Sequence, residues 1–204
     1  MPQSIDLRVA ELICSRLCHD LISPISAINN GIELIAEVGD EARPDADMLI
    51  AESAHSASRR LRVFRYAYGL AGQDVSLDEI RSVALAYFEG SKVQLDWPPI
   101  SVSLPPGMGK IILNLLLLAP ELARGACKVA LTASPGEIAV SYSGANAKLE
   151  EDIAAALDGA VLSDNLSPAS AHAVLTAALA ARLRAKLTHA QDADTVTLRM
   201  RWSS

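Results

Sequence analysis

A single histidine, His19, lies within a long amphipathic segment, and the next residue, Asp20, can assist nucleophilic chemistry at its imidazole. At about 100° per residue, His19 falls almost opposite the apolar stripe of this segment, so we expect its imidazole to face solvent. A neutral imidazole nitrogen is a good nucleophile near neutral pH. Asp20 can accept a hydrogen bond from Nδ1 and leave Nε2 free to attack. The pair predicts an imidazole that accepts a group delivered by another protein.

The element that must position His19 is predicted to be a helix over about residues 4–37. Pro24 removes one backbone hydrogen bond at a cost of roughly 3 kcal/mol, so we expect a kink five residues after the histidine. Gly39 predicts the end of this helix, and Asp45 is a candidate N-cap for the next one. The predicted buried stripe consists of Ile13, Leu17, Leu21, Pro24, Ile28, Ile32 and Ile35.

A second helix is predicted over about residues 46–70, with Leu61, Phe64 and Tyr68 on one face. It can pair antiparallel with the first helix. Two helices cannot bury both apolar stripes alone. We therefore predict a homodimer in which two hairpins form a four-helix bundle, with both copies of His19 on its outside.

The composition changes near residue 74, where short elements separated by proline and glycine begin. We therefore predict two domains, residues 1–73 and 74–204. Ser76 and Glu79 predict a capping box at the start of a helix. Together the elements predict an α+β chain whose second domain is an α/β sandwich on a mixed or antiparallel sheet. The predicted elements are helices at 77–90, 109–124 with a break at Pro120, 147–158 and 168–187, and strands at 93–97, 128–132, 138–142 and 195–202.

The composition excludes several classes of protein. A net charge of −6 without a basic cluster makes nucleic acid an unsuitable partner. No run of about 18 apolar residues and no signal-like N-terminus occur, so we expect no membrane association and a cytoplasmic protein. Three cysteines without a Cys-x-x-Cys pair argue against disulfides. Cys14 and Cys18 with His55 lack a fourth zinc ligand, and we interpret the thiols as small core side chains.

The run HDLISPISAINNGIEL, which begins at His19, resembles ChpT-family histidine phosphotransferases more than ordinary histidine kinases. Its first six residues are similar to the phosphoacceptor box of two-component kinases, with an acidic residue after the histidine and a proline five positions later. The resemblance covers most of the chain. It implies a dimeric helical hairpin followed by a degenerate kinase-type ATPase domain.

The motifs for ATP in that domain are largely missing. Asn114 matches the first asparagine of the kinase motif, but Leu118 stands where a magnesium-binding asparagine should be. Tyr142 replaces the aspartate expected to contact adenine. The segment 164–170, where the phosphate-binding lid should be, contains no glycine. Leucine cannot ligate a hard cation, and side chains deny phosphates close approach to the backbone, so we expect no cofactor bound by this chain.

An exposed phosphoacceptor histidine without an ATP site predicts phosphoryl relay between proteins. An aspartyl phosphate of one receiver domain would pass its phosphoryl group to Nε2 of His19, which would give it to a second receiver. The receiver would supply Mg²⁺ and a lysine. Asp20 would fix the tautomer, Arg16 is a candidate contact to phosphoryl oxygens, and Ser23 a weaker candidate for supporting dephosphorylation.

A receiver also needs a docking surface beside the histidine. Exposed apolar side chains such as Ile22 next to a reactive group favour an interface, although packing against the neighbouring helix or the second domain would explain them equally well. The predicted docking residues are Cys18, Ile22, Ser26, Asn29, Asn30 and Glu33.

The family resemblance implies a CckA-like donor and CtrA-like and CpdR-like acceptors, and hence a role in cell-cycle control. Two other functions stay open. A histidine autokinase with an aberrant ATP site would label His19 from ATP alone. A non-catalytic dimeric adaptor would keep its role after His19→Ala.

Overall fold

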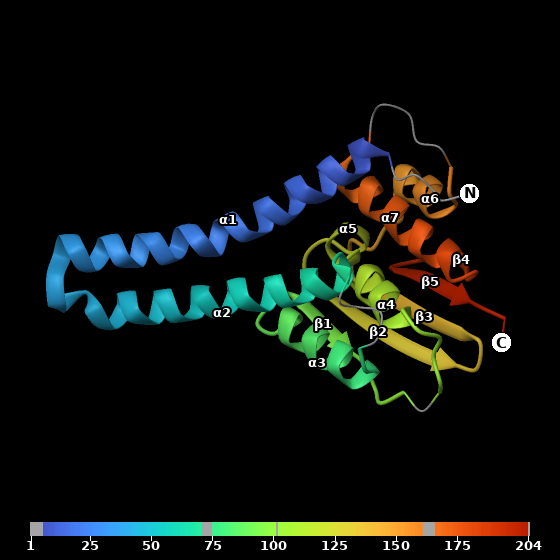
Figure 1. Ribbon diagram of the computed structural model, residues 1–204, viewed down its shortest axis with the longest axis horizontal. Helices are drawn as coiled ribbons and strands as arrows, with labels where there is room; N and C mark the ends of the chain where they lie inside the picture. The colour runs from blue at the N-terminus through green and yellow to red at the C-terminus, as the bar shows by residue number, and fades with distance from the viewer. Residues whose placement is uncertain (1–5, 71–74, 101, 161–165, 204) are drawn as a thin grey trace.

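The N-terminal part of the chain is a long helical hairpin that projects from a C-terminal α/β unit (Figure 1). This computed structural model describes residues 6–70, 75–100, 102–160 and 166–203. The hairpin consists of α1 (Leu7–Val38) and α2 (Arg43–Ala67), joined by the short 3₁₀ helix η1 (Gly39–Glu41). The two helices pack against each other, as predicted, and the N-terminal part of α1 lies against α7 instead. In the described part of the chain, no helix is long and apolar enough to cross a membrane.

The ends of α1 follow the capping signals in the sequence. The side chain of Asp6 accepts a hydrogen bond from the Arg8 backbone N–H, which satisfies a free donor of the first turn. Gly39, with φ of 82°, ends the helix as predicted. The predicted N-cap of α2 was wrong: the 3₁₀ turn leads directly into the helix at Arg43, so Asp45 lies within the first turn.

The buried stripe of α1 is narrower than predicted. Pro24 and Gly31 are buried in the seam with α2, but the Ile32 side chain is 54% exposed. A Cβ atom at Gly31 would lie 2.6 Å from Cγ1 of Ile50, so the two helices approach closely there. One neighbouring helix cannot cover an arc as wide as this apolar stripe, and Ile32 therefore faces outward.

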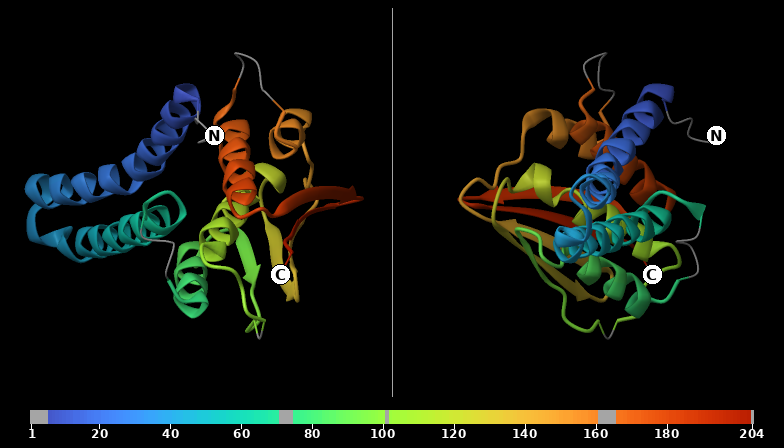
Figure 2. Two further views of the ribbon diagram at one scale, coloured as in Figure 1. Left: turned by 45° about the vertical axis from the view of Figure 1, so that its right-hand side comes forward. Right: turned by 90° about the vertical axis from the view of Figure 1, so that its left-hand side faces the viewer.

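The C-terminal unit, residues 75–203, contains a mixed sheet in the order β1-β2-β3-β5-β4 (Figure 2). β1 pairs with β2 in parallel, and the other pairs are antiparallel. Its elements are α3 (Leu77–Phe88), β1 (Val93–Asp96), α4 (Met108–Leu116), α5 (Ala119–Leu122), β2 (Cys127–Ser134), β3 (Glu137–Ser143), α6 (Glu151–Leu157), α7 (Pro168–Arg182), β4 (Lys186–Asp192) and β5 (Thr195–Arg201).

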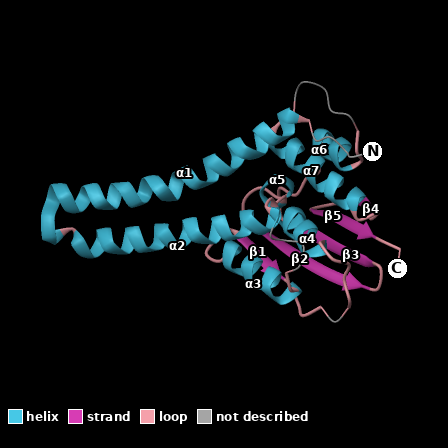
Figure 3. Cartoon of the chain, viewed as in Figure 1, coloured by secondary structure: helices cyan, strands magenta, loops and turns pink. Residues whose placement is uncertain are grey.

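Burial alternates along the central strands β2, β3 and β5, so one face of the sheet packs on the core and the other is more open. The helices cover the packed face (Figure 3). The base of the hairpin rests on this helical layer, because α2 contacts α3 and α4 while α1 contacts α7. The predicted fold class, a helical hairpin followed by an α/β sandwich, is confirmed.

Several details of the C-terminal unit differ from the prediction. α7 ends at Arg182 rather than at 187, and the chain then forms the edge strand β4, which was not predicted. The turn between them uses Arg184 at φ 53°, a conformation without the glycine that usually marks it. α6 begins at Glu151, not at 147. The domain boundary near residue 74 and the first two residues of segment 164–170 lie outside the described residues.

Candidate functional site

His19 stands on the outer face of α1, and its side chain is 89% exposed. Its Nδ1 atom lies 3.5 Å from Oδ1 of Asp20. This separation is long for a hydrogen bond but within the range of an ion pair. Asp20 itself is only 24% exposed. The imidazole therefore presents Nε2 to solvent, while a partly buried carboxylate stands beside its other nitrogen.

The backbone beneath His19 is held by an arginine from the second helix. Pro24 has no N–H, so the carbonyl of Asp20, four residues earlier, loses its helical partner. NH1 of Arg60 donates a hydrogen bond to that carbonyl oxygen at 3.0 Å. Arg60 thus replaces the bond that the proline removes, and it ties α2 to the turn that carries the histidine.

The Asp20 carboxylate contributes to the charge of the junction between α1 and the C-terminal unit. Burial raises the pKa of the Tyr87 phenol, and the negative charge of Asp20 raises it further, while Arg60 acts in the opposite direction. Burial likewise raises the pKa of Tyr68, with the charge of Arg16 opposing it. The charge of Asp20 therefore acts on both phenols, and the charge of Arg16 opposes it at each of them.

Arg16 does not extend toward the outer face of His19, in contrast to its predicted contact with phosphoryl oxygens. Its side chain is 14% exposed and points into the junction with the C-terminal unit. NH1 lies 3.3 Å from Nδ1 of His172, and NH2 donates to the Leu117 carbonyl at 3.2 Å. The same group forms an ion pair with Glu121 at 3.4 Å. These three partners hold the Arg16 guanidinium within the junction.

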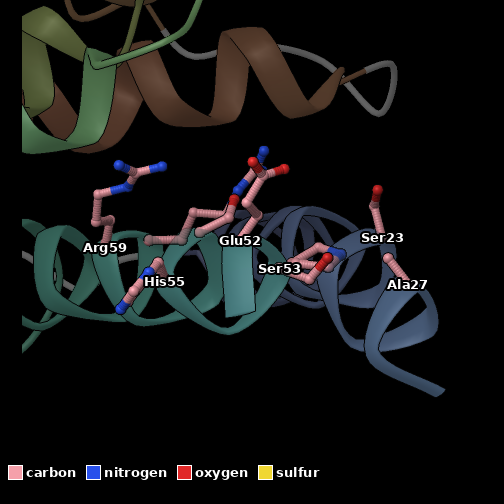
Figure 4. A pocket seen from close by; sticks show the side chains of 9 residues that line it. Ser23, Ala27, Glu52, Ser53, His55 and Arg59 are labelled. Carbon is pink, nitrogen blue, oxygen red and sulfur yellow. The ribbon is translucent and has the colours of Figure 1, made fainter. Parts of the chain in front are cut away.

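Ser23, exposed one turn after His19, lies at the edge of a groove between the two hairpin helices (Figure 4). The groove is lined by Ser23, Pro24, Ala27, Glu52, Ser53, His55, Ser56, Arg59 and Arg60.

Cys14 and Cys18 are exposed, so the interpretation of both thiols as core side chains was wrong. The seam with α2 buries the opposite side of α1. Among the described residues no group of three or more His, Cys, Asp or Glu side chains could hold a metal ion.

The predicted docking residues are all exposed in this single chain and follow α1 from His19 toward the tip of the hairpin. Ile22, at 62% exposure, is the most apolar member of this strip. Neither α2 nor the C-terminal unit covers it. The strip consists of Cys18, Ile22, Ser26, Asn29, Asn30 and Glu33.

Asn114, the remaining asparagine of the kinase motif, is fully buried and bonded within the protein. Its Nδ2 donates to the carbonyls of Ala67 and Lys110 at 2.9 and 2.8 Å. Its Oδ1 lies 3.1 Å from Nε2 of His172, which is also fully buried. Sequence reasoning gave His172 no role, because its partner Arg16 is 156 residues away and no local pattern links them.

The other two altered positions of the kinase motifs are also filled by packed side chains. Leu118 and Tyr142 are fully buried. The Tyr142 hydroxyl donates at 2.6 Å to the carbonyl of Leu115 near the end of α4, which also accepts a bond from the Leu118 backbone N–H. The side chains of Leu118 and Tyr142 therefore fill both positions, and the Tyr142 hydroxyl is bonded within the protein.

Residues 77–195 match the family model of the histidine phosphotransferase C-terminal domain. A stretch of 115 residues is 44% identical to the protein phosphotransferase ChpT of Brucella abortus (strain 2308) and covers 55% of this chain and 54% of that protein. The chain thus spans about half the length of this curated relative. A solved structure of a bacterial phosphotransferase is similar over 98% of this chain and 100% of its own, with 32% identity and a TM-score of 0.80. The structural match therefore includes both the hairpin and the C-terminal unit.

Proposed function

Because this chain belongs to the histidine phosphotransferase family, as its resemblance to ChpT proteins predicted, we propose that it relays phosphoryl groups between receiver domains through His19. The observation that carries the proposal is an imidazole that is 89% exposed beside a partly buried carboxylate. The packed side chains at Leu118 and Tyr142 support relay over autophosphorylation from ATP.

In the proposed reaction, Nε2 of neutral His19 attacks the phosphorus atom of an aspartyl phosphate. The N–P bond forms as the P–O bond to the aspartate breaks, and the aspartate leaves as a carboxylate. Asp20, whose Oδ1 lies 3.5 Å from Nδ1, moves to hydrogen-bond distance to hold the attacking tautomer, and the Nδ1 proton is released toward it. The receiver would supply Mg²⁺, so this chain has to provide orientation and access. Transfer to the second receiver reverses these steps.

We assign receiver docking to the exposed strip on α1 that includes Ile22 and Asn29. An exposed apolar side chain surrounded by polar ones, one turn from the nucleophile, suits a helix of a receiver domain. The family resemblance favours a CckA-like donor and CtrA-like and CpdR-like acceptors. In this proposal residues 1–73 carry transfer and dimerisation, and residues 74–204 form the degenerate ATPase-like domain.

We assign the remaining apolar face of the hairpin to a second copy of this chain. Ile25 and Ile32, seven residues apart on α1, are 49% and 54% exposed, and Leu61 on α2 is 54% exposed. By helical spacing these side chains lie on the side of the hairpin opposite the groove lined by Ser23 and Glu52. Two such faces would close a four-helix bundle.

A transfer assay tests the proposed function. The purified protein is incubated with labelled ATP alone and then with a phosphorylated receiver domain, with His19→Ala as the control. We expect label on the wild type only when the receiver is present. Label from ATP alone would identify an autokinase, and no label with several receivers, together with a His19→Ala variant that keeps its biological role, would identify an adaptor.

Two matched variants on α1 separate docking from dimerisation. Ile32→Asp places a charge in the face assigned to the second copy, and sedimentation should show a shift toward monomer. Ile22→Asp places the same charge on the strip beside His19, and it should leave the dimer intact while raising the KM for the phosphorylated receiver. The assignments are exchanged or wrong if Ile22→Asp dissociates the dimer or if Ile32→Asp leaves it unchanged.

A further inference from the structure

A buried chain of hydrogen bonds connects both helices of the hairpin to the C-terminal unit. NH1 of Arg16 on α1 lies 3.3 Å from Nδ1 of His172 on α7, and Nε2 of His172 lies 3.1 Å from Oδ1 of Asn114 on α4. Nδ2 of Asn114 then donates to the carbonyl of Ala67, at the end of α2, at 2.9 Å. The chain of bonds thus runs from α1 through α7 and α4 to α2.

The position of each proton in this chain of hydrogen bonds follows from Arg16, which can only donate. A guanidinium can only donate, so Nδ1 of His172 must accept the bond from Arg16. The proton of the neutral ring is then on Nε2, which donates to Oδ1 of Asn114. This leaves the Asn114 amide nitrogen as a donor, in agreement with the two carbonyls it faces. Only the neutral Nε2–H tautomer of His172 satisfies all of these partners.

The chain of bonds is also sensitive to geometry because it is buried. His172 and Asn114 are 0% exposed, and Arg16 is 14% exposed. A buried polar group that loses its partner is destabilised, so a rotation or slide of the hairpin on the C-terminal unit would leave these groups unpaired. The apolar contacts between α1 and α7, such as those of Ile13 with Ala171, are less directional than these hydrogen bonds, so the bonds favour one orientation.

That orientation matters because a receiver domain is expected to contact more surface than the strip of exposed residues on α1 offers. A standard protein interface takes about 800 Å² from each partner. A groove lined by Arg59 and Arg60 of α2, the segment 88–91 and Pro120 of α5 joins the hairpin to the C-terminal unit, and Arg60 also binds the carbonyl of Asp20, the residue after His19. A receiver that reaches the imidazole therefore lies alongside the C-terminal unit as well.

On the basis of the proposed phosphotransfer function, we propose that Arg16, His172 and Asn114 are positioning residues that hold the C-terminal unit in the orientation a receiver requires at His19. Arg16 acts through His172 and not on the phosphoryl group. The asparagine that resembles a kinase nucleotide-site residue serves here to join the two parts of the molecule.

The test compares two phosphoryl donors on Arg16→Ala. Phosphoramidate, a small donor, reports the reactivity of the His19 imidazole alone, whereas a phosphorylated receiver also requires the docking surface. We expect Arg16→Ala to lower kcat/KM for the receiver about tenfold, mainly through KM, and to change the phosphoramidate rate less than about twofold. Arg16→Lys, which keeps a donor for Nδ1, should recover part of the loss. Arg8→Ala, an exposed arginine on the same helix, should match the wild type.

Equal slowing with both donors would overturn the proposal, because Arg16 would then act at the phosphoryl group. An unchanged receiver rate would also overturn it. If the wild type accepts phosphoryl from phosphoramidate but from none of several receivers, the proposed relay fails instead. The ring-nitrogen NMR shifts of His172 then test the bond chain independently: an unprotonated Nδ1 about one pH unit below the ordinary histidine pKa supports it, and a protonated one refutes it.

Discussion

The bond between Arg60 and the Asp20 carbonyl should depend energetically on Pro24. The proline removes the N–H that would serve this carbonyl, and the arginine supplies a donor at 3.0 Å in its place. If Pro24 is replaced by alanine, residue 24 regains its N–H and can close the helical bond to Asp20. The bond from Arg60 then contributes much less to the free energy of unfolding.

The structure sets the size of this effect. A hydrogen bond from a charged donor to an otherwise unpaired carbonyl contributes about 1.5–3 kcal/mol, and partial exposure at this site favours the lower end. Arg60→Ala should therefore lower the free energy of unfolding by about 1.5 kcal/mol in the wild type. In the Pro24→Ala background it should lower it by less than about 0.5 kcal/mol. The expected coupling energy of about 1 kcal/mol exceeds the scatter of independent sites, roughly 0.3–0.5 kcal/mol.

The assay is urea unfolding of the wild type, the two single variants and the double variant at one protein concentration, followed by circular dichroism. A fixed concentration is needed because the proposed dimer would contribute to apparent stability. Arg59→Ala is the matched control, because this neighbouring arginine pairs with Glu89 and should be additive with Pro24→Ala. Additive effects of Arg60→Ala and Pro24→Ala would refute the reasoning, since the arginine would then not replace the missing helical bond.

Three further predictions concern stability. Gly31→Ala should lower the free energy of unfolding by about 1–3 kcal/mol because its Cβ would meet Ile50, and Ile50→Ala should relieve part of this loss in thermal unfolding. Tyr142→Phe removes the bond from the buried hydroxyl to the Leu115 carbonyl, which keeps its backbone bond from Leu118, and should cost about 0.5–1.5 kcal/mol in urea unfolding; an unchanged midpoint would contradict the assigned bond. Burial, followed by the charge of Arg16, lowers the pKa of His172 well below 6.5, so the unfolded state binds the proton first and stability is lost as pH falls below 6.5. Between pH 7.5 and 5.5 this loss should be about 1.4 kcal/mol, and His172→Gln should remove it. The groups facing His172 are Arg16, Tyr68 and Asn114.

Local signals predicted much of the fold because the chain uses them in the usual way. Ser76 caps α3 by accepting from the Glu79 N–H, and Pro135–Gly136 turns the hairpin between β2 and β3. Glu79 does not complete the predicted capping box; its carboxylate instead accepts from the Tyr66 hydroxyl on α2. The local pattern identified the cap, but it could not show that a nearby helix offers the carboxylate another donor.

The parts that were missed depend on contacts between distant residues. Nothing in the sequence around Arg16 distinguishes a guanidinium that meets a phosphate from one that meets His172, so its contact with His172 could not be predicted from its position one turn before His19. β4 is an edge strand whose pairing with β5 supplies its order, so its own residues carry a weak pattern. The exposure of His19 was predicted correctly because it requires only the period of one helix.

Asn114 shows how a polar residue of the C-terminal unit is used for contacts within the protein. Its amide oxygen and nitrogen both have partners inside the protein, so binding a ligand there would break bonds that join the hairpin to the C-terminal unit. Tyr142 likewise satisfies a carbonyl of α4. In a kinase these positions must stay open to nucleotide, and such openness leaves polar groups without permanent partners. Filling them stabilises a fixed junction, and a fixed junction beside an exposed imidazole is what transfer between large partners needs, because in-line geometry depends on how the whole receiver is held.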